Sequence, residues 1–481
     1  MKLDSYSALR RTSLSAAMIT LLGCSAIAAA AGVTPAELQV YADRANFTAD
    51  LDRADISHYI VTYAENALER NTPAMLADFS RVSRETGFAV THARTLATGA
   101  ELVEVTRSRV QMSGGNAEAA RSVMVAFAKN PGVAYVEPDR RMQIVLSPDD
   151  TSYSSQWDLF ESTGGQNQPS AWDISTGSGI NVAVLDTGIV PHTDLAGQTV
   201  GGYDFISSSV TARDGGGRDS NANDEGDWFN STECGTGYAS NSSWHGTHVS
   251  GTIGALTNNA KGIAGIAYGS KIVPVRVLGR CGGSTADIVD AIVWSSGGSV
   301  SGVPANQNPA RVINMSLGGG GACGSFQAAV NTARANGSVI VVAAGNSNAN
   351  VTTASPANCS GVTSAAATDR QGNRASYSNF GTTITVSAPG GETASQSNGI
   401  LSTLNSGTTT QGSESYAYYQ GTSMAAPHVA GLAAQVFALN PALTPDQARN
   451  FITSNARALP GTCSGGCGAG IINAQATLLA V

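Results

Sequence analysis

Charged residues are scarce in this chain of 481 residues. Asp, Glu, Lys and Arg together make up 13% of it, whereas roughly one quarter is usual in globular proteins. The net charge is −8, and no block of basic residues occurs, so the sequence lacks the electrostatic footprint of a nucleic-acid-binding protein. Aromatic residues are also few, at 6%, while glycine is abundant, with 55 residues. This composition favours tight turns and close packing of helices on sheets.

Hydrophobic runs long enough for a permanent membrane span are absent from the sequence. At the N-terminus, three basic residues precede a short apolar run at 14–22, and small residues follow at 26–31. This pattern predicts a signal peptide over residues 1–31, and we expect a secreted protein. Cys24, in Leu21-Leu-Gly-Cys24, would in the alternative carry a lipid and give an anchored or periplasmic form.

The cysteines are not spaced with histidines as in a zinc site. One of the seven lies in the signal region, and an even number remains after it. In an exported chain this predicts three disulfides, although fifteen pairings are possible. We expect sequential pairs, partly because Ser-Gly-Gly between the last two cysteines can close a small loop; free buried thiols are the alternative. The six are Cys234, Cys281, Cys323, Cys359, Cys463 and Cys467.

Two domains are predicted after the signal peptide. Residues 32–147 read as strand, helix, strand, strand, helix and strand, which indicates a ferredoxin-like α+β module. From 148 to 481, apolar strands such as 180–185 and 339–343 alternate with helical segments. That alternation predicts an α/β fold with a parallel sheet flanked by helices on both faces.

Three motifs in the second domain could combine into one nucleophilic site. Gly421-Thr-Ser423 precedes an apolar helix and places a hydroxyl at its N-terminus, although a serine there is often only a helix cap. A hydroxyl needs a base and an orienting carboxylate. A buried strand ending at Asp186 supplies the carboxylate, unless this residue merely caps a turn, and His245-Gly-Thr-His248 supplies an imidazole.

The order of these motifs, each in a strand–turn–helix context, resembles the subtilisin-like serine proteases (subtilases) over residues 150–481. A fourth motif, Val341-Val-Ala-Ala-Gly345-Asn346, is similar to the segment that carries the family's oxyanion-hole asparagine. The resemblance implies a subtilisin-like fold and serine endopeptidase activity, with Ser423 as nucleophile and His245, the first histidine of its motif, as general base. It implies that Asp186 orients the imidazole and that Asn346 stabilises the oxyanion.

Substrate-binding segments follow from the same resemblance. Two of them resemble the walls of the first specificity pocket, and a third resembles the edge that adds the peptide as a strand. Because these segments hold no carboxylate, we expect a broad preference for large uncharged residues. The residues are Ser316, Leu317 and Gly318, then Ala343, Ala344 and Gly345, then Gly282 and Gly283.

Calcium is the cofactor that the resemblance implies, in a structural role. The segment 257–263 resembles a thermitase-like calcium loop, and mixed oxygen ligands suit Ca²⁺. The implied ligands are the side chains of Asp150, Asp194 and Asn259 and the carbonyls of Leu256, Lys261 and Ile263. A second candidate is the acidic stretch with Asp214, Asp219, Asp224 and Asp227, for which a solvated acidic loop is the alternative.

The segment 32–147 is similar to subtilase propeptides, including its end Val133-Ala-Tyr-Val-Glu-Pro-Asp139. This implies a zymogen whose propeptide acts as intramolecular chaperone and inhibitor and is removed between about Arg140 and Asp149. An unrelated small binding domain is the alternative. We expect a monomer that acts on protein and peptide substrates. Two rival functions remain, an esterase that uses the same triad and a non-catalytic binding protein on a protease scaffold.

Overall fold

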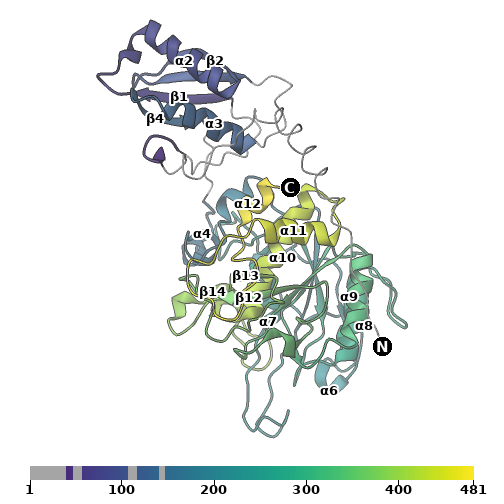
Figure 1. Ribbon diagram of the computed structural model, residues 1–481. Coiled ribbons are helices and arrows are strands. Elements are labelled where there is room, and N and C mark those ends of the chain that lie inside the picture. The colour runs from purple at the N-terminus through teal and green to yellow at the C-terminus, as the bar shows by residue number, and fades with distance from the viewer. Residues whose placement is uncertain (1–39, 47–56, 107–115, 140–146) are drawn as a thin grey trace, which may run out of the picture. The chain divides into compact units, whose positions relative to one another are not determined.

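The structure is a computed structural model, and the chain divides into two compact units, residues 1–144 and 145–481 (Figure 1). The expected signal peptide, Cys24 and most of the expected linker lie outside the described residues. In the part of the chain that is described, no helix is both long and apolar enough to cross a membrane. The described residues are 40–46, 57–106, 116–139 and 147–481.

The first unit contains the expected βαββαβ order. Its four-stranded antiparallel sheet has the strand order β2-β3-β1-β4. Alternate residues of β1, among them Val61, point into a core that Phe79 and Phe127 of the two helices complete. The elements are β1 (His58–Tyr63), α2 (Thr72–Thr86), β2 (Ala89–Thr95), β3 (Glu101–Thr106), α3 (Asn116–Ala128) and β4 (Val133–Pro138).

The second unit is built on a seven-stranded parallel sheet, which confirms the predicted α/β fold. Most residues of its strands are buried, and apolar residues predominate in β5, β7, β8 and β10, as parallel strands covered by helices require. In sheet order they are β13 (Val386–Pro389), β12 (Thr363–Thr368), β10 (Val339–Ala343), β8 (Val312–Met315), β5 (Asn181–Asp186), β7 (Lys271–Arg276) and β6 (Tyr203–Asp204).

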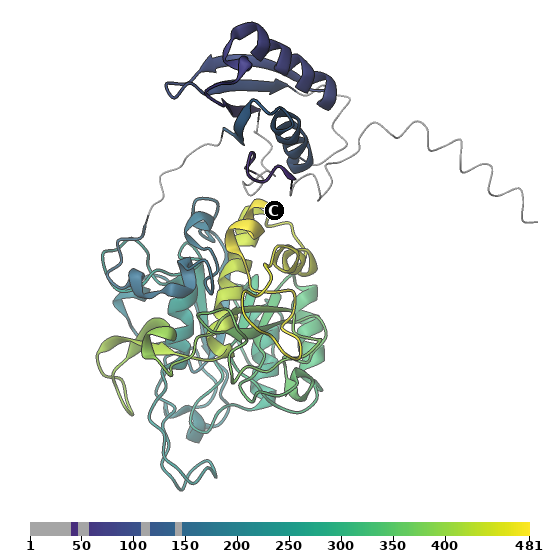
Figure 2. The same ribbon diagram turned by 60° about the vertical axis from the view of Figure 1, so that its left-hand side comes forward.

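Helices cover both faces of this sheet (Figures 1 and 2). Val182 and Val184 of β5 pack in a core with α7 and α10, whereas Ala183 and Leu185 pack in a second core with α8 and α9. This two-residue alternation places one layer of helices on each side. The helices are α4 (Trp157–Phe160), α5 (Pro169–Trp172), α6 (Ser209–Ala212), α7 (His245–Gly254), α8 (Thr285–Ser295), α9 (Phe326–Ala335), α10 (Thr422–Leu439), α11 (Pro445–Ser454) and α12 (Ala474–Leu479).

Two small antiparallel pairs and three disulfides complete this unit. The pairs are β9 (Gly319–Gly320) with β11 (Ala354–Ser355) and β14 (Ile400–Asn405) with β15 (Glu414–Tyr419). The disulfides confirm the expected sequential pairing: Cys234–Cys281, Cys323–Cys359 and Cys463–Cys467. Helix α11 begins at Pro445, and the side chain of its N-cap, Thr444, forms a capping box with Gln447.

Candidate active site

The sequence motifs meet at the carboxyl edge of the parallel sheet, where open α/β sheets bind their ligands. Asp186 is the last residue of β5, and Ala343 is the last residue of β10. His245 begins α7, and Ser423 lies in the first turn of α10. Strands β5 and β10 flank β8 on either side, so these four residues from distant parts of the sequence face one region.

Asp186 and His245 form a close pair. His245 Nδ1 lies 2.7 Å from Asp186 Oδ1 and 2.9 Å from Oδ2, and Asp186 is fully buried. Gly246 permits this approach, because a Cβ there would lie 2.1 Å from the carbonyl oxygen of Gly188. Burial opposes a charged imidazole, but the nearby carboxylates, first Asp186 and then Asp227 and Asp224, together outweigh it, and the pKa of His245 is raised above its ordinary value.

Ser423 is held by Ser316 in both directions. The Ser423 hydroxyl donates to the Ser316 carbonyl oxygen at 3.1 Å, and the Ser316 hydroxyl donates to the Ser423 carbonyl oxygen at 2.8 Å. That carbonyl is free because its partner four residues on is Pro427, which has no N–H. Within the described residues no hydrogen bond joins Ser423 Oγ to His245, although both line the same groove; such contacts are often loose in unliganded sites.

Asn346 is anchored to the start of α10 through its amide oxygen. Its Oδ1 accepts from the N–H of Thr422 at 2.9 Å and from the Thr422 hydroxyl at 2.8 Å. A backbone N–H can only donate, so the oxygen end of the amide is fixed and the Nδ2 end faces elsewhere. The Ser423 N–H belongs to the first turn of α10 and has no acceptor within the helix. Two donors are therefore available beside Ser423.

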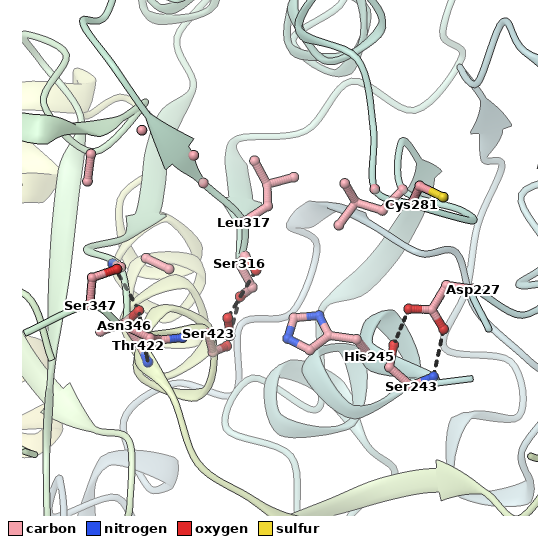
Figure 3. A pocket seen from close by; sticks show the side chains of 18 of the residues that line it. Asp227, Ser243, His245, Cys281, Ser316, Leu317, Asn346, Ser347, Thr422 and Ser423 are labelled. Atoms are coloured by element: carbon pink, nitrogen blue, oxygen red, sulfur yellow. Dashed lines mark hydrogen bonds between the residues drawn. The ribbon is translucent and has the colours of Figure 1, made fainter. Parts of the chain in front are cut away.

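A groove of about 830 Å³ joins these groups (Figure 3). His245, Ser423 and Asn346 line it. Most of the predicted substrate-binding residues line it too, but two do not. Ala344 is fully buried in the core beneath, and Gly283 lines a smaller neighbouring hollow of about 370 Å³. The predicted residues in the groove wall are Ser316, Leu317, Gly318, Ala343, Gly345 and Gly282.

One side of the groove was not predicted from the sequence. The Cys234–Cys281 disulfide lines it, together with Asp227, Phe229 and Tyr238 from the segment that precedes α7. This segment lacks helical or strand periodicity, so pattern alone gave no reason to place it here. The expected pairing of Cys234 with Cys281 was the available signal. Cys281 precedes Gly282, which was expected at the edge that binds the peptide, so the disulfide brings the segment to that edge.

The residues of the first predicted calcium site lie together. Asp150 and Asp194 are 5% and 0% exposed, and Asn259 Nδ2 donates to Asp194 Oδ1 at 2.8 Å. Burial and the neighbouring Asp194 raise the pKa of Asp150. Among the described residues neither carboxylate has a Lys or Arg partner within ion-pair distance. A Cβ on Gly262 would lie 2.2 Å from Asp194 Oδ2, so only glycine leaves this space open.

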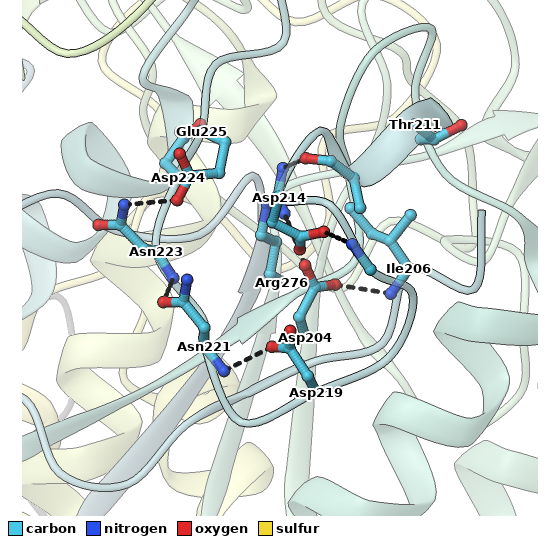
Figure 4. A network of polar contacts seen from close by, with 12 residues as sticks. Asp204, Ile206, Thr211, Asp214, Asp219, Asn221, Asn223, Asp224, Glu225 and Arg276 are labelled. Carbon is cyan, nitrogen blue, oxygen red and sulfur yellow. Dashed lines mark hydrogen bonds and ion pairs between the residues drawn. The ribbon is translucent and has the colours of Figure 1, made fainter. Parts of the chain in front are cut away.

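The carboxylates of the second predicted site have separate partners (Figure 4). Asp214 lies 3.3 Å from the guanidinium of Arg276, a fully buried cation that also pairs with Asp204. Asp224 accepts from the Thr187 hydroxyl at 2.6 Å, and burial raises its pKa to about 7. Asp219 and Asp227 accept from other neighbours: Asp219 from the N–H of Asn221, and Asp227 from Ser243.

No group of three or more His, Cys, Asp or Glu side chains suited to a metal occurs among the described residues. For the second site, the separate partners give the physical reason. The buried guanidinium of Arg276 already supplies the positive charge beside Asp214 and Asp204. For the first site, the expected ligand set contains only two carboxylates and relies on an amide and carbonyl oxygens.

The other two histidines of the motifs lie away from the groove. His248 is fully buried, its Nε2 lies 3.1 Å from the carbonyl oxygens of Ile400 and Ala417, and burial lowers its pKa to about 3. His428 is also fully buried and contacts Asp158. The structure therefore places His245, and neither His248 nor His428, beside Ser423 in the groove.

Comparison with known proteins shows which family the chain resembles. The family model described as "Subtilase family" matches residues 177–470. The chain is 50% identical over 473 residues to an extracellular protease of Xanthomonas campestris pv. campestris, covering 96% of this chain and 78% of that protein. It is 40% identical over 482 residues to an extracellular basic protease of Dichelobacter nodosus, covering 96% and 76%.

A solved structure gives the same result. A protease from Pseudoalteromonas arctica superposes with a TM-score of 0.69 at 56% identity, covering 70% of this chain and 99% of that one. The family match lies within the second unit. The chain belongs to the subtilase family of serine peptidases.

Proposed function

We propose that the chain is an exported serine endopeptidase, made as a zymogen, that hydrolyses proteins through an acyl-enzyme. The observation that carries this proposal is the His245–Asp186 pair at 2.7 Å, which faces the same groove as Ser423 and Asn346. Export is supported by relatives named extracellular proteases and by three disulfides, which persist in oxidising compartments.

In the acylation step, Ser423 Oγ forms a bond to the carbonyl carbon of the substrate peptide, and its proton moves to His245 Nε2. Asp186 holds the ring through Nδ1 and stabilises the imidazolium that forms. His245 then gives the proton to the amide nitrogen as the C–N bond breaks, and the amine leaves. The acyl group remains on Ser423 as an ester.

The oxyanion of each tetrahedral intermediate is stabilised by two N–H donors, Asn346 Nδ2 and the Ser423 backbone. Loss of one such donor costs about 2.7–4 kcal/mol of transition-state stabilisation, a range measured on subtilisin, a member of this family. In the second half of the reaction His245 takes a proton from water, the hydroxide oxygen bonds to the acyl carbon, and Ser423 regains its proton as the ester bond breaks.

Substrate preference in the first pocket follows from its walls. The segments 316–318 and 343–345 carry small or apolar side chains, and neither holds a carboxylate. We propose a broad preference there for large uncharged residues. Exclusive cleavage after Arg or Lys in a peptide panel would contradict it.

Residues 32–147 are proposed to act as the propeptide, chaperone and inhibitor of the protease. The support is a separately packed core and a boundary between compact units near residue 144. The test is intact mass with N-terminal sequencing of secreted wild type beside Ser423→Ala. We expect wild type to begin near Ser147 and the variant to keep the propeptide. Identical trimming of both would show maturation by another protease.

A structural Ca²⁺ ion is proposed for the first predicted site. The support is that Asp150 and Asp194 are buried carboxylates without a cationic partner among the described residues. With the Asn259 side chain and the carbonyls of Leu256, Lys261 and Ile263 they would supply the oxygen ligands that calcium prefers. Bound calcium would neutralise Asp150 and Asp194 and hold the loop 256–263. In the inactive Ser423→Ala background, excess chelator should lower the melting temperature, and Asp194→Asn should remove that response. Unchanged melting in chelator would refute the site.

A further inference from the structure

The groove carries one carboxylate among its described lining residues, Asp227, and no Lys or Arg. Asp227 lies in the segment before α7 and is only partly buried. Figure 3 shows His245 between Ser423 on one side and the Asp227–Ser243 pair on the other. The negative charge of Asp227 also acts on the His245 ring and contributes to the raised pKa of His245. The groove is therefore negative on the side of His245 that faces away from the nucleophile.

Neutral donors hold this carboxylate in place without cancelling its charge. Oδ1 accepts from the N–H of Ser243 at 2.6 Å, and Oδ2 accepts from the Ser243 hydroxyl at 2.8 Å. No ion pair involves Asp227 within the described part of the chain. The nearby guanidinium of Arg213 lies over the ring of Trp228 at 3.8 Å and within 4.0 Å of Glu233. Asp227 is thus a fixed anion that leaves room for a cation from the substrate.

The direction of a bound peptide places one substrate side chain near Asp227. Successive side chains of an extended peptide point to opposite sides. When the residue before the scissile bond fills the pocket between 316–318 and 343–345, the residue preceding it points the other way, toward His245. Phe229 and Tyr238, with ring centroids 5.8 Å apart, line the same side of the groove. Aromatic faces suit the long stem and charged head of Lys or Arg.

We propose that Asp227 is a specificity-determining residue that selects Lys or Arg at the substrate position immediately N-terminal to the residue in the first pocket. This inference rests on the proposed endopeptidase function and deepens it. The protease would accept an uncharged residue in the first pocket and favour a basic one beside it.

The test uses peptides that are identical except at that position, which holds Lys, norleucine or Glu. For wild type we expect kcat/KM to fall in the order Lys, norleucine, Glu, with Lys above norleucine by up to about fivefold, the upper value for an exposed charge pair. In Asp227→Asn the ratio of Lys to norleucine should approach one. The ratio is taken within each variant, so a general loss of activity from a disturbed Ser243 cancels.

Two controls separate this inference from other causes. Asp290→Asn makes the same charge change at a partly buried carboxylate outside the groove and should leave the ratio unchanged. In wild type the ratio should fall as salt rises from about 0.05 to 0.5 M, because salt screens the pair; this result does not depend on the folding of a variant.

Three results would overturn the inference: a wild-type ratio of one or below, an unchanged ratio in Asp227→Asn, or an equal change in both variants. In each case cleavage of the norleucine peptide would leave the protease function intact. Failure to cleave any of the peptides would instead count against the proposed function.

Discussion

Two Asp–His pairs lie in the second unit, and they differ in what the second ring nitrogen contacts. In the pair at the groove, His245 uses Nδ1 for Asp186, and its Nε2 has no hydrogen-bond partner among the described residues; the side chain is 21% exposed. In the pair between α4 and α10, His428 Nε2 lies 3.0 Å from Asp158 Oδ2, and Nδ1 lies 2.7 Å from the carbonyl oxygen of Met424. Both members of that pair are fully or almost fully buried.

The difference shows what an Asp–His pair needs in order to transfer a proton. A ring with both nitrogens engaged in the interior cannot exchange a proton with a substrate, and it serves to join two helices. A ring with one nitrogen left at a groove can accept a proton from Ser423. Helix α10 takes part in both arrangements, because it carries Ser423 near its start and His428 five residues later.

The largest effect is expected from removing the ring at the groove. His245→Ala should lower kcat by about 10⁶-fold, the size found for the triad of subtilisin, because the proton of Ser423 then has no acceptor. The melting temperature, measured in a Ser423→Ala background to prevent autolysis, should fall less than in a variant that breaks a fully buried pair, because this ring is partly exposed and the buried Asp186 carboxylate keeps the N–H of Thr187 as a donor. A variant with substantial activity would show that another group acts as the base.

The buried pair should give the opposite result. His428→Ala leaves the carboxylate of Asp158 buried without a partner, and breaking a buried pair costs about 3–5 kcal/mol of stability. Chemical unfolding in the Ser423→Ala background measures this loss. Activity per folded active site, counted by titration, should stay within about tenfold of wild type. Equal stability of the His245→Ala and His428→Ala variants would contradict the division of roles.

A smaller effect is expected where α10 meets β8. Ser316→Ala removes the donor to the Ser423 carbonyl, and Pro427 leaves that carbonyl without a helical substitute. A buried acceptor without a partner costs about 1–3 kcal/mol. We expect kcat to fall by about tenfold, because the nucleophile is less well placed, while KM changes little. Ser316→Thr keeps the hydroxyl and should restore most of the rate; failure of Thr to do so would point to packing instead.

The smallest effect concerns the titration of the ring at the groove. Because the pKa of His245 is raised and only the neutral ring accepts a proton, kcat/KM should rise with pH through a midpoint above about 6.5. Asp227→Asn removes one anion that favours the imidazolium, so the midpoint should move to lower pH. A shift to higher pH would contradict this account of the charges.

Much of this arrangement could be predicted from the sequence, because it follows from local patterns. Apolar runs at 180–185 and 339–343 predicted strands of a parallel sheet, and the motifs around Asp186, His245 and Ser423 predicted groups that combine into one site. Family, fold and serine peptidase activity are confirmed. The sequential disulfides are present as expected.

The remaining features depend on contacts that no local pattern encodes. Arg276 pairs with Asp204 and Asp214 only because β7 lies beside β6 in the sheet, and this pairing changes the meaning of the acidic stretch. Ala344 faces the core because the strand alternation continues past Ala343. Asp227 reaches the groove through an irregular segment that the Cys234–Cys281 disulfide ties to a part of the chain distant in sequence.

The central claim is that Ser423 is the nucleophile and His245 its base, and labelling with a serine-directed organophosphonate tests it most directly. Intact mass and peptide mapping of the mature protein should find a single adduct on Ser423, absent from Ser423→Ala and strongly slowed in His245→Ala but not in His428→Ala. An adduct on another residue, or an unlabelled protein that still cleaves peptides, would contradict the account.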